Sequence, residues 1–173
     1  MITKINLLLF LLLSTIGLVT AQPQVPRTGN NVLPQVDFDA VEINGVSFEE
    51  LCETNGEVTE MRRLFGSDLS YEFIDDILTY KNFGNQHLGI TFNSDDRSYF
   101  YPQSIDFFTS EATIKIKGRT ISVGDNIDML GPGFAFNQSY GGVVFFDQGT
   151  ESMCFSFKVD GNDLVIGIEF DAY

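Results

Sequence analysis

Acidic residues are the most abundant side chains in this sequence that could do chemistry. Asp and Glu number 24 against 10 Lys and Arg, whereas His occurs once, at His87, and Cys twice. A catalytic His needs a nucleophile and an orienting acid close by, and no Ser or Cys stands in a recognisable nucleophile motif. One His and two distant Cys cannot complete a zinc site. We therefore expect no catalytic residue, no metal centre and no cofactor, and we interpret His87 as a loop residue.

Two acidic residues, Asp106 and Asp171, occupy equivalent positions 65 residues apart. A pair of carboxylates is the minimal equipment of many acid-dependent hydrolases, so a secreted hydrolase is the alternative function that this sequence allows. Three further clusters, Asp75-Asp76, Asp95-Asp96 and Asp160–Asp163, lack the alternating ligand spacing and the distal Glu of a calcium loop. These clusters are typical of turns.

The two cysteines, Cys52 and Cys154, leave two alternatives open. An exported protein can form disulfides, and a bridge between these positions would close a loop of about 100 residues, adding about 4 to 5 kcal/mol. Strand alternation, however, places Cys154 on a free sheet face, whereas Cys52 lies near a helix. The residues are therefore either a disulfide pair or two unpaired thiols.

The first residues have the pattern of a secretory signal peptide. Lys4 precedes an apolar run from Leu7 to Leu18, and the small residues Val19-Thr20-Ala21 follow. We expect a signal peptide over residues 1–21 and a flexible linker with three prolines over residues 22–35. The mature chain is then a soluble secreted or periplasmic protein that does not insert into a membrane.

The charge of the mature chain excludes one class of partner. Removal of Lys4 changes the formal net charge from 10 − 24 = −14 to 9 − 24 = −15. A surface of this sign repels nucleic acid and anionic lipid. We therefore expect no nucleic-acid partner.

A phrase that ends on an apolar residue and Gly occurs twice, in GEVTEMRRLFGSDL (56–69) and in ISVGDNIDMLGPGF (121–134). At a constant shift of 65 residues, apolar positions align with apolar positions through the rest of both halves. The shift predicts two tandem units, residues 36–110 and residues 111–173. Each unit is expected to contain a strand, a Gly turn, a short helix and three further strands, so we predict an α+β fold in which each unit packs a short helix on a small antiparallel sheet.

This layout resembles the repeat unit of beta-lactamase-inhibitor-protein-like folds and of the small BamE-like envelope proteins. The resemblance is carried by VGDNIDMLGPGF (123–134) and by the order of the strands. It implies a helix layer on one face of the sheet and protein binding on the other face, and it transfers no functional residue.

Alternation of side chains along the strands predicts which residues lie on the free face. Phe92 and Phe157 are equivalent and are expected in the core beneath the helices, whereas Thr79 and Lys81 are expected on the free face. The candidate binding residues on that face are Thr91, Phe146, Ser156 and Lys158.

These patterns predict a non-catalytic exported protein that binds another exported or envelope protein. The binding surface is expected to be the free sheet face or the groove between the two units. Phe146 is the candidate anchor because it is large and apolar, and burial between the two units is the alternative role of its side chain.

Overall fold

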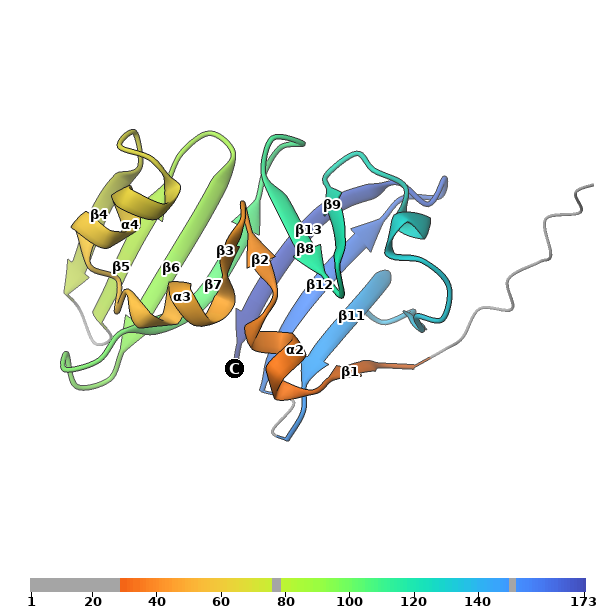
Figure 1. Cartoon of the computed structure of the whole chain (residues 1–173), viewed down its shortest axis with the longest axis horizontal. Coiled ribbons are helices and arrows are strands. Elements are labelled where there is room, and N and C mark those ends of the chain that lie inside the picture. Colours follow the sequence, from red (N-terminus) through yellow and green to blue (C-terminus); the bar gives the residue numbers. More distant parts are fainter. Residues whose placement is uncertain (1–28, 76–78, 150–151) are drawn as a thin grey trace, which may run out of the picture.

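The computed structural model describes residues 29–75, 79–149 and 152–173 (Figure 1). The signal peptide expected over residues 1–21 lies outside the described residues. The prediction of two helix-on-sheet units is wrong, because the described chain is mostly β and folds around one large mixed sheet of nine strands and a second sheet of four.

The nine-stranded sheet has the order β1-β11-β12-β13-β7-β6-β5-β4, with β10 pairing β11 beside this path. All of its neighbours are antiparallel except β1 and β11. The strands are β1 (Asn31–Leu33), β4 (Ser70–Asp75), β5 (Thr79–Gly84), β6 (Leu88–Ser94), β7 (Tyr101–Phe107), β10 (Phe136–Asn137), β11 (Gly142–Asp147), β12 (Met153–Val159) and β13 (Val165–Ala172).

A second layer covers one face of this sheet (Figure 1). It contains the four-stranded sheet, ordered β3-β2-β8-β9, together with the helices. The elements of this layer are β2 (Glu42–Ile43), β3 (Val46–Ser47), β8 (Thr113–Ile116), β9 (Arg119–Ser122), α2 (Gln35–Asp39), α3 (Phe48–Glu53), α4 (Val58–Phe65) and the 3-10 helix η1 (Ile127–Leu130).

Local sequence signals explain where the elements of the covering layer begin and end. The side chain of Ser47 caps α3 by accepting a hydrogen bond from the Glu50 amide at 3.1 Å. α4 ends at Gly66, whose φ of 106° is readily adopted only by glycine. Both hairpins of the small sheet turn through two residues of positive φ, Asn44-Gly45 and Lys117-Gly118, which suits the twist of the flanking strands.

The offset of 65 residues recurs in the strand positions, but the two halves are not separate units. β6 and β12 begin 153 − 88 = 65 residues apart, and β7 and β13 end 172 − 107 = 65 residues apart. β7 then pairs with β13, and β2 pairs with β8, so each sheet runs through both halves. The second half also has the single-turn η1 where an α-helix was expected.

One aromatic core joins the halves. The rings of Phe38 and Phe155 are 5.1 Å apart, and those of Phe48 and Phe170 are 4.8 Å apart. Residues of the first half therefore pack directly on strands of the second. The largest side chains with less than 2% exposure are Phe38, Phe92, Phe145, Phe155, Phe157 and Phe170.

Part of the expected linker is ordered. Residues 31–33 form β1, and α2 begins at Gln35. The amide of Asn31 donates to the carbonyl oxygens of Ala135 at 3.0 Å and Val144 at 2.9 Å, and its side-chain oxygen accepts from the Ala135 amide at 2.8 Å. These bonds fasten the start of the described chain to the edge of the sheet.

Candidate functional site

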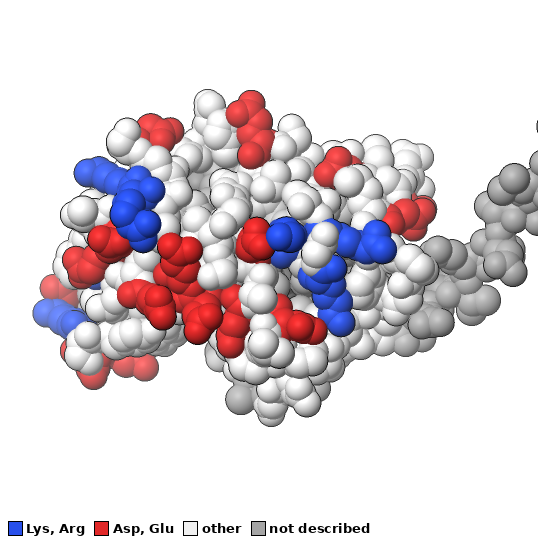
Figure 2. Space-filling model, viewed as in Figure 1, with Lys and Arg blue, Asp and Glu red and all other residues white. Residues whose placement is uncertain are grey.

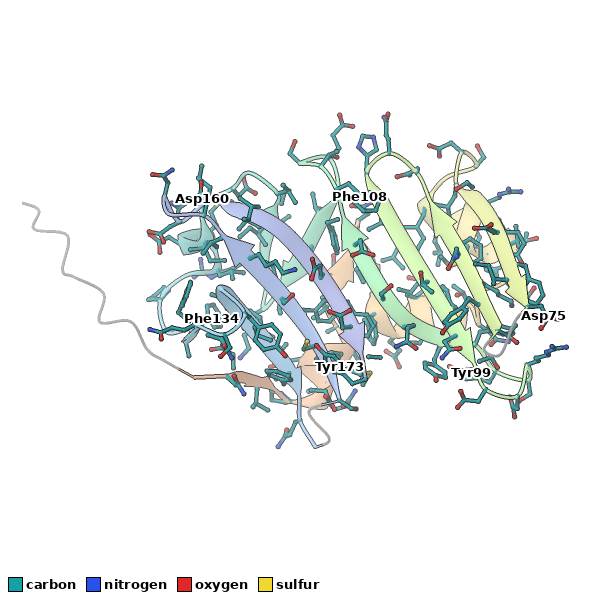
Figure 3. All side chains as sticks on the ribbon, turned by 180° about the vertical axis from the view of Figure 1, so that it is seen from behind. Asp75, Tyr99, Phe108, Phe134, Asp160 and Tyr173 are labelled. Carbon is teal, nitrogen blue, oxygen red and sulfur yellow. The ribbon has the colours of Figure 1, made fainter. Side chains whose placement is uncertain are left out.

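The face of the nine-stranded sheet that points away from the helices and the small sheet is the candidate site. No described helix or second sheet covers it, as Figure 3 shows from behind. We call it the open face. Small residues line its middle: in one row across the strands, Thr91 pairs with Ser104, and Ser104 pairs with Asp171.

The four residues predicted for binding all lie on the open face, but they do not form one exposed group. Thr91 is on β6, separated by β7 and β13 from Ser156 and Lys158 on β12. Ser156 is 2% exposed and Phe146 is 6% exposed, whereas Thr91 and Lys158 are half-buried. Lys158 is therefore the member of this set best placed to meet a charged partner.

Phe146 belongs to a small hydrophobic cluster on the open face, not to an exposed patch. It packs with Val144 and Cys154, apart from the main core. The ring of Tyr140 lies edge-on to it, with ring centres 6.3 Å apart. The phenol oxygen of Tyr173 lies 3.9 Å from the Cys154 sulfur and completes the cover. The side chain is thus buried on its own face of the sheet, not between two units.

The open face carries a row of carboxylates on β7 and β13. Asp106 lies directly opposite Glu169 across this strand pair, and Asp171 follows two positions along β13 on the same side. Glu169 was missed from the sequence, although alternation along 165–172 places it with Asp171. Both oxygens of Glu169 accept from the Lys158 amine, at 2.7 and 2.8 Å. One ammonium group therefore serves three carboxyl groups.

Crowding perturbs the protonation of this row. Burial, followed by the charges of Glu169 and Asp171, raises the pKa of Asp106. Burial and the charge of Glu169 also raise the pKa of Asp171. Hydrogen bonding to Glu169 raises the pKa of Lys158, which keeps its charge more firmly. Asp106 and Asp171 make no printed side-chain hydrogen bond or ion pair within the described part of the chain. Their ionised forms lack direct compensation.

Two residues expected on the open face lie on the other side. Thr79 and Lys81 of β5 are buried at 4% and 9% exposure. The Lys81 amine donates to the Asn55 carbonyl oxygen at 3.1 Å and sits 3.9 Å from the centre of the Phe100 ring. The prediction failed because Lys81 pairs with Phe92 while Val143 pairs with Phe157, so the offset at this strand is 143 − 81 = 62.

Both cysteines are free thiols, the second of the two alternatives that the sequence left open. Cys154 lies in the open-face cluster, whereas Cys52 lies in α3, in the covering layer. Burial raises the pKa of Cys52 to about 12, and the charges of Asp39, Glu49 and Glu53 add to the shift. Figure 2 shows acidic side chains gathered over α2 and α3. Burial also raises the pKa of Cys154.

The remaining polar clusters have structural roles. Asp160 Oδ1 accepts from the amides of Asn162 at 2.8 Å and Leu164 at 3.0 Å, and Asp96 Oδ1 accepts from the Ser98 amide at 2.9 Å. These acids close turns, as expected. His87 Nδ1 lies 2.7 Å from Thr109 Oγ1, in a loop next to β6 and without a neighbouring thiol.

Three searches of the described residues bear on other kinds of site. No group of three His, Cys, Asp or Glu side chains there is arranged to hold a metal ion. None of the described helices has the length and apolar character needed to cross a membrane. An open depression in the covering layer is lined by Asp37, Glu42, Lys115 and Lys117, and the amine of Lys115 donates to Glu42 at 2.7 Å.

Comparison with known proteins gave no match: no family model, no curated protein and no solved structure is significantly similar to this chain. The resemblance of residues 123–134 to BamE-like and beta-lactamase-inhibitor-protein-like repeats therefore stays a prediction.

Proposed function

We propose that this protein is an exported, non-catalytic binding protein that holds a partner protein on its open face. The partner presents Lys or Arg side chains to the carboxylates of Asp106, Glu169 and Asp171. The surrounding small residues, such as Thr91 and Ser104, leave room for a partner's backbone to approach the sheet. Phe146 supports the surface from below and is not the anchor.

The uncompensated carboxylate row is the observation that carries this proposal. Asp106 and Asp171 have raised pKa values because burial and neighbouring acids disfavour their ionised forms. A cationic side chain docking between them favours those ionised forms and strengthens as water leaves the interface. Lys158 is already engaged by Glu169, so the missing cations must come from outside the chain.

A defined basic peptide tests the site. We expect a peptide rich in Lys and Arg to bind the purified protein at low salt, and Asp106→Asn/Asp171→Asn to raise its Kd at least about tenfold. The matched control is Glu49→Gln/Glu53→Gln, which makes the same charge change on exposed residues of α3. Equal weakening by both double variants would show attraction to net charge alone and would reject the site.

Export is tested separately by the mass of the protein recovered outside the cytoplasm. Cleavage after Ala21 gives a mature chain that begins at Gln22. A product that retains Lys4 would contradict the signal peptide.

A secreted hydrolase is the second candidate, favoured by the raised pKa of Asp106 and of Asp171 on one face. The native protein is then expected to cleave at least one member of a panel of chromogenic glycosides, and Asp106→Asn/Asp171→Asn to lose about 100-fold or more of that activity. Absence of cleavage by the native protein, or unchanged cleavage by the double variant, removes this candidate.

A further inference from the structure

β4 is an unprotected edge of the nine-stranded sheet. It is the terminal strand of the sheet order, and all six of its residues are exposed. Three of them are large and apolar: Tyr71 is 38% exposed, Phe73 47% and Ile74 38%. Its described hydrogen bonds run to β5 on one side only, so its outer backbone groups have no partner in the described chain. Such an edge is a template for another strand.

The opposite edge of the sheet is managed differently. There β11 is covered along its length by two short strands, β1 with three residues and β10 with two. β4 has no such cover, no proline and no register shift against β5. The two edges therefore differ in what they can accept.

The charge on β4 favours an approach by another acidic molecule. β4 carries two acids, Glu72 and Asp75, and Asp75 is ion-paired with Arg97. Only Glu72 is left without a partner on a strand of a chain whose net charge is −14. Arg62 and Arg63 of α4 lie at the same end of the molecule, where Figure 2 shows basic side chains grouped over α4.

We propose that two copies of this chain pair through β4, antiparallel, to form one continuous sheet across a two-fold axis. Directly opposite residues of an antiparallel pair point to the same face, and Tyr71 and Phe73 point with Phe83 toward the covered face. Two full registers preserve this facing. One places Glu72 opposite its symmetry mate, which is destabilising.

The other register places Phe73 opposite Phe73 of the second copy and Glu72 opposite Ile74. It joins two aromatic rings at the axis and separates the two unpaired carboxylates. The strand is thus complementary to itself in one register. This surface is independent of the carboxylate row on β7 and β13, so either can fail without the other.

Solution mass as a function of protein concentration tests the pairing. The purified protein is expected to form a dimer, and Phe73→Lys is expected to raise the dimer Kd at least about thirtyfold, as loss of a central aromatic anchor does. Phe108→Lys is the matched control, since Phe108 is 56% exposed and lies on another strand end. Because both copies are acidic, added salt should tighten the dimer.

Cysteine cross-linking tests the register. Under oxidation, Phe73→Cys is expected to give a covalent dimer, whereas Glu72→Cys and the unmodified protein are not. Unchanged melting of Phe73→Lys establishes that the fold is intact. A monomeric mass at every concentration, or a dimer that survives Phe73→Lys, overturns the proposal, and so does a monomer that instead binds an extended peptide at β4.

Discussion

Asp106 of β7 and Glu169 of β13 lie directly opposite each other across the strand pair that joins the two halves of the large sheet. Like charges at such positions are about 4.5–5.5 Å apart at their β-carbons and destabilise the pairing. Lys158 binds Glu169 and relieves the repulsion only in part. The strand junction is therefore more stable when Asp106 is protonated.

We predict that Asp106→Asn stabilises the protein in a pH-dependent way. Since the folded-state pKa of Asp106 is raised, its contribution to stability is full at low pH and is lost as the pH rises through that pKa. The melting temperature of Asp106→Asn should exceed that of the native protein near neutral pH, and the difference should shrink as the pH falls.

Asp96→Asn is the control of opposite sign. Hydrogen bonds from Ser98 lower the pKa of Asp96, so any stabilisation by this carboxylate is present at neutral pH and is lost on acidification. A difference for Asp106→Asn that grows toward acid pH would contradict the assignment.

Phe92→Ala and Phe157→Ala should each destabilise the protein by about 3–5 kcal/mol. Phe92 is fully buried and Phe157 is 1% exposed, in a single core. Denaturant unfolding measures the change, with Phe108→Ala as the exposed comparison. Losses below about 1 kcal/mol at both core positions would mean that the facing of β6 and β12 is reversed.

Phe146→Ala should lower the melting temperature, with a loss of about 2–4 kcal/mol, because the side chain is 6% exposed under Tyr140. Phe146→Leu retains most of the apolar volume and should lose less. Unchanged melting of Phe146→Ala would show that the open-face cluster does not stabilise the fold, and would return Phe146 to the list of candidate partner contacts.

Gly142→Ala should prevent correct pairing of β11 with β12. A β-carbon on Gly142 would overlap the carbonyl oxygen of Phe157, and two backbones cannot separate without loss of the ladder. We expect insoluble or molten protein, measured by soluble yield and near-UV circular dichroism. Gly161→Ala is the control because a β-carbon there meets no atom within 4 Å, and normal folding of both variants would contradict the close approach.

Cys52 should react slowly with a thiol reagent in the folded protein. A pKa raised from 9.0 to about 12 lowers the thiolate fraction at neutral pH about a thousandfold. Cys154→Ser isolates this thiol, and a thiol assay follows its reaction with and without denaturant. Two thiols should titrate after unfolding without reductant. Failure to find them would restore the disulfide alternative.

Local features of this fold could be predicted from the sequence because each has a local physical cause. Alternation places Phe92 and Phe157 in the core, and Asn44-Gly45 marks a hairpin turn. The carboxylates Asp106 and Asp171 could be named as a pair because they occupy equivalent strand positions. Glu169 follows from the same alternation once the end of β13 is known.

The joining of the halves could not be predicted, because period-two patterns do not specify which strands become neighbours. Nothing in β7 and β13 distinguishes pairing with each other from pairing within separate sheets. Lys81 was misplaced for a related reason: its strand is shifted by three residues against the repeat, and its buried amine is compensated by the Asn55 carbonyl oxygen and the Phe100 ring. Such long-range compensation leaves no trace in the local sequence.

The order of strands in the large sheet has a consequence for how the chain folds during synthesis. β13, the last strand along the sequence, lies in the interior of the sheet between β12 and β7. A nascent chain that has emerged only as far as β12 therefore has two unfinished sheets with unpaired edges, and those edges can aggregate. Because contacts such as β1 with β11 and β2 with β8 span most of the chain, folding should be slow and post-translational, which favours a chain kept unfolded until it is complete.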